Sequence, residues 1–464
     1  MIDWAKGRVV HCRWLEHRPV QELRVALEGG TGEVSLAYHY TDVLPPVTVG
    51  DRVMINRTAV KLKLGTGGID FVCAVLEQNP MGKETAVGAD GLPSKKGDGG
   101  PDKRAIPERN AAENIGPVQE DPEDSEKGDL TGNGGIGQQQ AASGFAKAVS
   151  GKKGEGEQKG GRMMKLRYTP VQRAVYAVEE EGGLHHGLFR GKLKLEGMPV
   201  LIGGLHSMLP VALSWLRYRG EQAGGGSAPS VAYVMTDGGA LPLAVSHHAA
   251  VLRGLGWLCG TVTAGHAYGG DLEAMNKYSA LLAAKHVLRA DIAIACMGPG
   301  SAGTGTRLGH TAVEVAELVH AVNALGGIPI VMPRLSFADA RERHYGLSHH
   351  IVSALGDIAL SGAILPLPGA LEPARRIVVQ RQLERSGCDK RHQCLWIDGV
   401  IAADAQRAIQ RYPQAITTMG RGLRDDPSYF LGVCAAAEHA FRQLAGFDAV
   451  PAAPSAERGG PSPG

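Results

Sequence analysis

The sequence predicts an α/β protein in which a mostly parallel sheet with helices on both faces follows a small all-β, barrel-like N-terminal domain. Two observations predict this fold. Short β-prone runs separated by turns fill the first 80 residues, and from residue 162 onward strand-like and helix-like runs alternate along the chain. Serial strand–helix units are typical of a parallel sheet with helices on its faces.

Residues 1–80 are expected to form a small closed barrel or sandwich. Their β-prone runs alternate in polarity and are separated by turns such as Gly29-Gly30 and Pro45-Pro46. Several short strands at this spacing are typical of small all-β domains. The runs are residues 7–12, 21–27, 33–38, 51–55 and 71–76. A glycine-rich loop at residues 65–68 is interpreted as a structural turn, with a ligand-facing loop as the alternative.

Residues 81–161 differ in composition from both neighbouring regions. Gly, Lys, Glu, Asp, Gln and Pro dominate there, and aliphatic residues are sparse and aperiodic. Such a segment buries too little apolar surface to offset chain entropy, so we expect a disordered, solvated insert. The tail, residues 448–464, is rich in Pro, Ser and Gly and is also expected to be disordered.

Residues 162–447 are expected to form one α/β ligand-binding domain. Strands are predicted near residues 198–203, 230–235, 258–263, 290–296 and 328–332. Helices are predicted over residues 207–219, 246–255, 272–288 and 312–325. Two further strand candidates and two further helices are expected to complete the same domain, at residues 363–367, 395–397, 401–411 and 429–444.

Composition and charge exclude several classes of protein. The net charge is only +2 over 464 residues, so no global basic field favours nucleic acid or an anionic membrane. The chain begins without a signal-peptide pattern, and no apolar run approaches the roughly 20 residues that a membrane span needs. The seven cysteines lack regular spacing and suit a reducing compartment better than a disulfide framework. We therefore expect a soluble cytoplasmic protein.

The most informative stretch is the glycine-rich run from Met297 to Thr306, which follows a predicted strand and precedes a helical pattern. In open parallel sheets, ligands bind outside the carboxyl ends of the strands, where a glycine-rich turn can aim backbone N–H groups at an anion. A purely structural turn is the alternative. The candidate ligand-binding residues of the run are Gly298, Gly300, Gly303, Thr304, Gly305 and Thr306.

The spacing Gly298-x-Gly300-x-x-Gly303 matches the dinucleotide-binding fingerprint, but its context does not. Further glycines delay the helix, and the next strand ends in Pro333-Arg334 instead of an acidic residue. A nucleotide-hydrolase phosphate loop would need a lysine that the run lacks. A nicotinamide site is therefore only a third alternative.

Polar residues also follow other predicted strands, at the same edge of the sheet. Asp237 is a candidate catalytic acid, and the alternative is that it caps the next turn. His206 and His266 are candidates for acid–base chemistry. Asp271 is expected to be the N-cap of a helix that begins at Leu272.

The densest group of chemically capable side chains lies between residues 339 and 350. Arg341 and Arg343 could clamp a carboxylate or a phosphate. The candidates for proton transfer near neutral pH are His344, His349 and His350. This group therefore joins the catalytic candidates at the strand ends.

Two considerations limit that interpretation. Ser348 could simply cap a helix that begins at His349, within an ordinary polar loop. Because neighbouring residues on a helix point in different directions, at most one of His349 and His350 is expected to face the site. No compact spacing of His, Cys, Asp or Glu predicts a metal centre, so no metal ligand is assigned.

Six segments of the chain carry a family resemblance: residues 64–68, 165–170, 236–242, 298–306, 346–350 and 418–422. Together they resemble a bacterial family catalogued as domain of unknown function 3866. That family supplies no established activity, cofactor or catalytic residue to carry over. The resemblance implies a bacterial origin and a single functional unit built from residues 1–80 and the region after Arg162.

The expected function is that of an enzyme, a transferase or hydrolase acting on a small phosphorylated or nucleotide-like metabolite. The reason is that several strand-end loops carry polar residues that a sheet edge does not need. The alternative is a non-catalytic sensor or adaptor that binds a small effector, and a nicotinamide-dependent oxidoreductase is third. The expected partner is an anionic small molecule, the cofactor is unassigned, and a homo-oligomer is left open.

Overall fold

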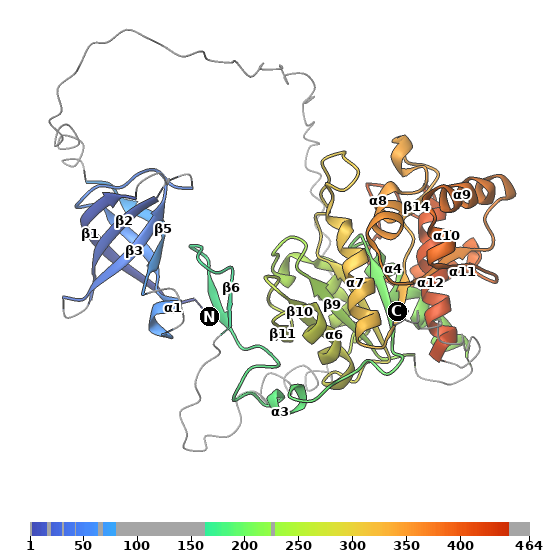
Figure 1. Cartoon of the computed structure of the whole chain (residues 1–464), viewed down its shortest axis with the longest axis horizontal. Helices are drawn as coiled ribbons and strands as arrows, with labels where there is room; N and C mark the ends of the chain where they lie inside the picture. The colour runs from blue at the N-terminus through green and yellow to red at the C-terminus, as the bar shows by residue number, and fades with distance from the viewer. Residues whose placement is uncertain are drawn as a thin grey trace, which may run out of the picture. The chain divides into compact units, whose positions relative to one another are not determined.

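The computed structural model of the chain (Figure 1) describes most of the two regions that were expected to be ordered. The described residues are 2–15, 20–29, 32–41, 43–63, 68–79, 163–223 and 228–444. The expected insert at 81–161, the expected tail at 448–464 and the glycines at 65 and 67 lie outside these residues.

The N-terminal strands close into a barrel in the order β1-β2-β3-β5-β4, which confirms the barrel and excludes the sandwich. β4 returns to pair with β1, as in a Greek key. β1 pairs with both β2 and β4, and a bulge between Val9 and His11 bends it for this purpose. The elements are β1 (Trp4–Trp14), β2 (Val20–Leu27), β3 (Val34–Tyr40), β4 (Arg52–Asn56), α1 (Thr58–Lys61) and β5 (Asp70–Glu77).

The second region contains an eight-stranded sheet in the order β11-β10-β9-β12-β8-β13-β16-β17. Every neighbouring pair is parallel, which confirms the predicted sheet. The central strands are buried along their whole length, as expected for a sheet covered on both faces. The strands are β8 (Pro199–Gly203), β9 (Val231–Thr236), β10 (Gly260–Ala264), β11 (Leu272–Ala274), β12 (Ile292–Met297), β13 (Ile328–Val331), β16 (Ile364–Pro368) and β17 (Gln393–Ile397).

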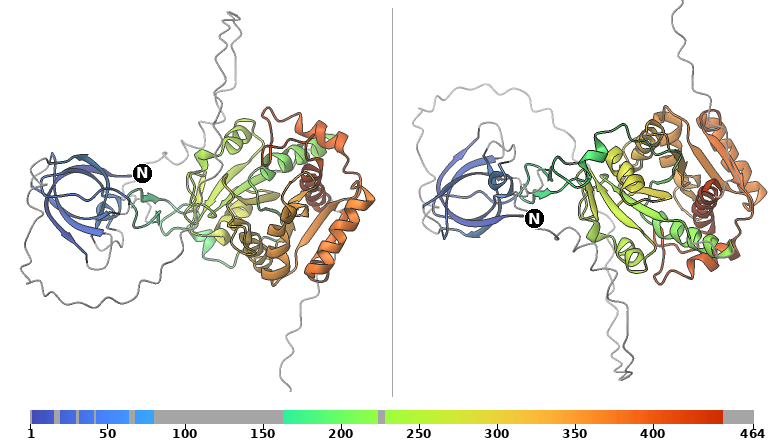
Figure 2. Two further views of the ribbon diagram at one scale, coloured as in Figure 1. Left: turned by 90° about the horizontal axis from the view of Figure 1, so that it is seen from above. Right: turned by 90° about the horizontal axis from the view of Figure 1, so that it is seen from below.

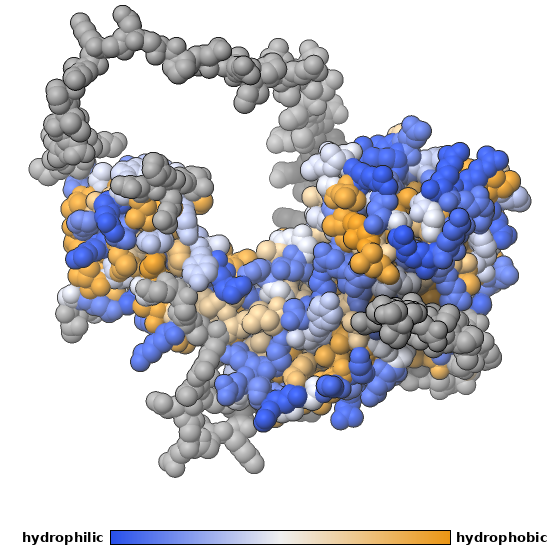
Figure 3. Space-filling view, viewed as in Figure 1, coloured by the Kyte–Doolittle hydropathy of each residue, from blue (hydrophilic) through white to orange (hydrophobic). Residues whose placement is uncertain are grey.

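Helices cover both faces of this sheet, as the two views of Figure 2 show. One apolar core lies between the sheet and α4 (Met208–Gln222), α5 (His247–Gly254), α11 (Ala402–Ile409) and α12 (Pro427–Leu444). A second core lies between the opposite face and α6 (Lys277–His286), α7 (Glu314–Ala324), α8 (His349–Ser353) and α9 (Pro373–Ser386). On the face shown in Figure 3, hydrophilic residues accordingly dominate the surface of this region.

The remaining elements are short. They are β6 (Met163–Lys165), β7 (Arg173–Val175), α3 (His186–Phe189), η2 (Leu243–Val245), η3 (Thr311–Val313), β14 (Leu335–Ser336), η4 (Glu342–His344), β15 (Gly346–Leu347), the π-helical turn η5 (Ala354–Ile358) and α10 (Cys388–Arg391). Within the described ranges, none of the helices has the length and apolar character that a membrane crossing requires.

The helix expected over residues 272–288 is divided in the structure. Residues 272–274 form the edge strand β11, and α6 begins only after Asn276, whose side chain accepts hydrogen bonds from two backbone N–H groups of the first turn. Asp271 is therefore not the N-cap. Its carboxylate accepts instead from the N–H and the hydroxyl of Thr261, at 2.9 and 2.8 Å, and so joins the loop to β10.

The strand order fixes where a ligand can enter. From β9 the chain moves outward to β10, whereas from β12 it moves in the opposite direction to β13. The loops after these neighbouring strands therefore diverge, and in open parallel sheets such a point holds the ligand crevice. The glycine-rich run follows β12 and Asp237 follows β9, so both lie at this point.

A short hairpin of β6 and β7 is fastened to the β10–β11 edge by a buried lysine. Lys165 is fully buried, and its Nζ donates to the carbonyls of Thr263 and Ala267, at 3.1 and 2.5 Å, and to the carboxylate of Glu273 at 2.6 Å. The backbone N–H of the next residue donates to Nδ1 of His266. Three acceptors satisfy the ammonium group, which is the condition for burying it.

We predict that Lys165→Met lowers the free energy of unfolding by about 3–5 kcal/mol, because it removes the cation that pairs with the mostly buried carboxylate of Glu273 and leaves the carbonyls of Thr263 and Ala267 without this donor. Urea denaturation of the full chain measures the change. Lys61→Met is the matched control, since Lys61 makes an exposed ion pair with Asp3 and its loss is expected to cost less than about 1 kcal/mol. Equal losses in the two variants would show that Lys165 does not anchor the hairpin.

Candidate functional site

The glycine-rich run forms a folded turn that returns to the sheet edge at His310. Gly303 pairs with His310, and the N–H of Thr304 donates to the carbonyl of Gly309 at 2.7 Å. The hydroxyl of Thr304 also donates to this carbonyl, and the hydroxyl of Thr306 accepts from the N–H of Gly309. Both threonine hydroxyls thus hold the turn together, and their proposed contact with a ligand stays a prediction.

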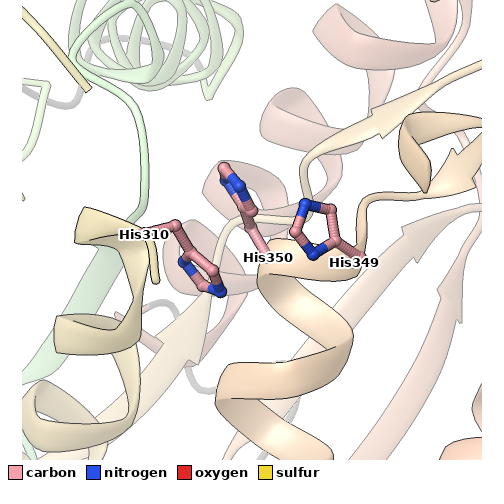
Figure 4. Close-up of side chains that lie close together, drawn as sticks. All are labelled: His310, His349 and His350. Atoms are coloured by element: carbon pink, nitrogen blue, oxygen red, sulfur yellow. The ribbon is translucent and has the colours of Figure 1, made fainter. Parts of the chain in front are cut away.

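Four imidazoles meet beside this turn, and we call His310, His344, His349 and His350 the histidine cluster. The rings of His310 and His350 stack with their centroids 4.0 Å apart, and that of His349 lies 4.3 Å from His350. His344 lies 5.1 Å from His350. One nitrogen from each of His310, His349 and His350 lies within 4.8 Å of the other two, and Figure 4 shows these three rings grouped between the segment before α7 and the start of α8.

The structure therefore brings together the three predicted histidines of residues 339–350 and adds His310. Ser348 caps α8 by accepting from the N–H of His350, which is the alternative considered for this loop. The expectation that only one of His349 and His350 faces the site is not met. Both lie in the first turn of α8, where side chains lean toward the helix N-terminus, so two successive residues reach the same space.

Serine hydroxyls hold two of the rings, and one of these serines sets the proton position of His310. The hydroxyl of Ser353 donates to the carbonyl of His349 at 2.7 Å, so it accepts from Nε2 of His310 at 2.9 Å. The lone pair of His310 is then on Nδ1, which is buried and makes no hydrogen bond of good geometry among the described residues, although the backbone carbonyl of Arg307 also acts on this ring. Nε2 of His349 is likewise buried without a partner there. Nδ1 of His344 is held by Ser348 at 2.7 Å.

A buried arginine borders the histidine cluster. Arg334 is 6% exposed, and its Nη1 donates to Nδ1 of His350 at 3.0 Å. Because a guanidinium can only donate, the proton of the neutral His350 ring lies on Nε2. Over the described ranges no carboxylate forms an ion pair with Arg334: Asp339 is bound in bidentate fashion by Arg341, at 2.9 and 2.8 Å, and also by Arg421.

The two arginines predicted to clamp a ligand do not lie beside the imidazoles as buried cations. Arg341 is engaged by Asp339, and Arg343 is exposed. Arg334, which the sequence analysis used only as evidence against a dinucleotide site, is the buried cation of the site. The signal that could have found it is its position, because it follows the buried strand β13 as Asp237 follows β9.

Burial lowers the pKa of each imidazole in the histidine cluster below its ordinary value. The positive charge of Arg334 adds to the effect of burial and helps to lower the pKa of His344 to about 3. The pKa of His350 falls to about 2, through burial, His310 and Arg334. At neutral pH the cluster therefore holds four neutral imidazoles next to one cation, and neutral imidazole nitrogens can bind metal ions.

A second acid–base group lies where β9 and β12 diverge. Glu314 begins α7 and is 8% exposed, and the hydroxyl of Thr236 donates to its Oε1 at 2.8 Å. Burial raises the pKa of Glu314 to about 7, and the charge of Asp237 acts in the same direction. A carboxyl group that titrates near neutrality can donate or accept a proton. Asp237 itself is exposed, and it lies close enough to Glu314 for its negative charge to help raise the pKa of that carboxyl group.

The other two predicted histidines lie apart from the histidine cluster. His206 is buried, and its Nε2 pairs with the hydroxyl of Ser246 at 2.7 Å while its Nδ1 faces the hydroxyl of Tyr233 at 3.3 Å. His266 accepts from the backbone of Leu166. In the parts of the chain that the structure covers, neither ring contacts a ring of the cluster, so the structure gives both histidines local hydrogen-bonding partners.

The chain belongs to the family described as "Protein of unknown function (DUF3866)", whose model matches residues 36–89 and 132–437. The match covers most of the chain and includes the whole histidine cluster, Arg334 and Glu314. No curated protein and no solved structure shows detectable similarity to the chain. The match thus confirms the family resemblance. Because the family has no described function, it assigns no chemistry to the site.

We predict that the difference in free energy of unfolding between Glu314→Gln and the natural protein, called here the stability gap, depends on pH. Burial raises the pKa of Glu314 in the folded protein to about 7 from 4.5. The folded state therefore loses no stability to ionisation of this group below pH 4.5, and the loss grows as pH rises through 7. Glutamine keeps the shape without ionising. The variant should gain relative stability between about pH 5 and pH 8, by up to about 3 kcal/mol.

Chemical denaturation at both pH values measures this gap. Glu384→Gln, on the exposed surface of α9, is the control and should give a gap that changes by less than about 0.5 kcal/mol. A gap for Glu314→Gln that stays constant with pH would mean that Glu314 does not ionise as a buried group.

Proposed function

We propose that this member of the family is an enzyme, a hydrolase or transferase, that acts on a small phosphorylated or nucleotide-like metabolite at the histidine cluster. The observation that carries the proposal is a buried arginine, without a carboxylate partner among the described residues, beside four neutral imidazoles at the carboxyl edge of a parallel sheet. That edge is where ligands of open α/β sheets bind.

Arg334 is the group best suited to hold the anion. A buried guanidinium is normally paired, because an uncompensated buried charge is costly. Asp339 cannot pair fully with Arg334, since it already accepts two bonds from Arg341 and one from Arg421. A phosphate or carboxylate of a ligand would supply the missing negative charge through charge-assisted hydrogen bonds. The proposal therefore gives Arg334 the clamping role first assigned to Arg341 and Arg343.

The imidazoles supply proton transfer to such a ligand. His349 carries an unpartnered Nε2, so it can take a proton from water or from a substrate hydroxyl. A bound anion near Arg334 would raise the proton affinity of the cluster by offsetting the positive charge that now lowers it. Nδ1 of His344 is already held by Ser348, so His344 is assigned to positioning.

The alternatives use the same crevice and differ in outcome. A non-catalytic sensor would bind the anion without turning it over. A nicotinamide enzyme is disfavoured, because the glycine-rich run folds back through a turn and α7 begins only at Glu314. We place the protein in a reducing compartment such as the bacterial cytoplasm, in keeping with seven cysteines that are all unpaired.

We predict that a thermal-shift screen of nucleotides and sugar phosphates finds a stabilising ligand. A ligand present at about 100 times its Kd adds about 2.7 kcal/mol to the free energy of unfolding. The stabilisation should disappear in Arg334→Met, which removes the anchoring charge. It should also disappear in Gly300→Val, because Gly300 has a φ of 100° that a β-branched residue rarely adopts.

Arg385→Met, which changes an exposed arginine on α9, is the control and should keep the full shift. Without ligand, Arg334→Met should be at least as stable as the natural protein, because it removes an uncompensated charge. Turnover of the stabilising ligand, followed by phosphate release or product chromatography, separates the enzyme from the sensor. A screen with no hit at millimolar concentration would count against both.

A further inference from the structure

We propose that His310, His349 and His350 bind a single transition-metal ion of the zinc class. This inference goes beyond the proposed function, because binding of the ion requires neither substrate nor turnover. Each residue offers one imidazole nitrogen, and the three nitrogens lie within 4.8 Å of one another. Ligands at Zn–N distances of about 2.0–2.1 Å on one ion lie at most about 4.2 Å apart, so small side-chain adjustments close the site.

Unsatisfied nitrogens are the second observation. His310 is more than nine-tenths buried, and the bond from its Nε2 to Ser353 leaves Nδ1 without a hydrogen bond of good geometry among the described residues, although the backbone carbonyl of Arg307 also acts on the ring. Nε2 of His349 is also buried without a partner among the described residues. Buried polar nitrogens without partners are costly and rare, and a metal ion bound at these rings would give them one.

The surroundings of the rings suit metal ligands. A ligating imidazole usually donates its other N–H to a fixed acceptor, and His310 donates to Ser353 in this way. His349 and His350 are fixed by the first turn of α8, which Ser348 caps. The two sides of the site are therefore joined, because Ser353 belongs to the same helix as the histidine pair.

The donor set points to the class of metal. All three donors are imidazole nitrogens, and no carboxylate or thiolate of the described residues joins the group. Zn²⁺, Co²⁺, Ni²⁺ and Cu²⁺ accept such donors, whereas Mg²⁺ and Ca²⁺ need oxygen ligands. Three protein ligands would leave a fourth position for water or for an oxygen of the anion near Arg334.

Arg334 provides a test in which loss of a side chain is expected to strengthen metal binding. Its guanidinium occupies the lone pair of the neutral His350 ring at Nδ1, so His350 can bind an ion only after this hydrogen bond is released, and it adds a positive charge close to where the ion would lie. Both effects oppose binding of a cation. Arg334→Met should therefore bind Zn²⁺ more tightly than the natural protein does, although it loses the anion.

The test is titration of the full-length, tag-free, chelator-treated chain with Zn²⁺, followed by calorimetry and metal analysis. We expect one ion per chain and at least about a tenfold weaker Kd in both His310→Ala and His349→Ala. His247→Ala changes an exposed histidine at the start of α5 and should bind as the natural protein does. Co²⁺ should give visible absorption bands of a bound ion that His310→Ala lacks, and Mg²⁺ should give no binding.

His310→Gln guards against misfolding, because its amide can still donate to Ser353 while it lacks the imidazole ligand. Unchanged Zn²⁺ affinity in folded His310→Gln and His349→Ala would overturn the metal site, as would weaker affinity in Arg334→Met. If Zn²⁺ binds but no phosphate ester stabilises the protein in the thermal-shift screen, the metal site is supported and the proposed substrate class is rejected. The two proposals therefore fail separately.

Discussion

All eight strands of the large sheet run parallel, and this single constraint gathers every strand-to-helix loop at one edge. Residues far apart in the chain consequently meet there. His310 comes from the loop after β12, Arg334 follows β13, and the pair at the start of α8 follows the β14–β15 ribbon. Where β9 and β12 diverge, Glu314 is enclosed as well. The sheet thus accounts for both the position and the depth of the site.

Charge and burial at this edge depend on each other. Arg334 is held inside without a carboxylate among the described residues, and a proton on any nearby imidazole would add a second positive charge. The imidazoles therefore stay neutral, and the lone pairs that Arg334 does not engage remain available. The acid Glu314 shows the converse, because burial with only a threonine hydroxyl as donor favours its protonated form. The same desolvation thus prepares nitrogen acceptors on one side and a proton donor on the other.

Much of the fold could be predicted from local signals, since the barrel strands, the strand–helix alternation and the Ser348 cap are all properties of short segments. The division of residues 272–288 was missed because Asp271 and Asn276 are both good N-caps and only pairing with β10 decides between them. α9 was missed because most of its face is charged and exposed, although Pro373 and Gly387 mark its ends. The position of Arg334 after β13 could have marked it, whereas His310 and Glu314 are ordinary residues in the sequence that only the tertiary arrangement of the loops reveals.

The glycine-rich run has a structural role that can be read from its own contacts. A side chain at Gly309 would collide with both threonine hydroxyls, so glycine is required there for the turn to close. A Cβ on Gly303 would lie 3.4 Å from Cβ of His310 and 3.6 Å from Nε2 of His350, which shows how closely the turn passes the histidine cluster. The run therefore delivers His310 and forms a wall over the imidazoles. Under our proposal, Arg334 and a metal ion then bind the anion, and the absence of a lysine or an early helix from the run is no longer an obstacle.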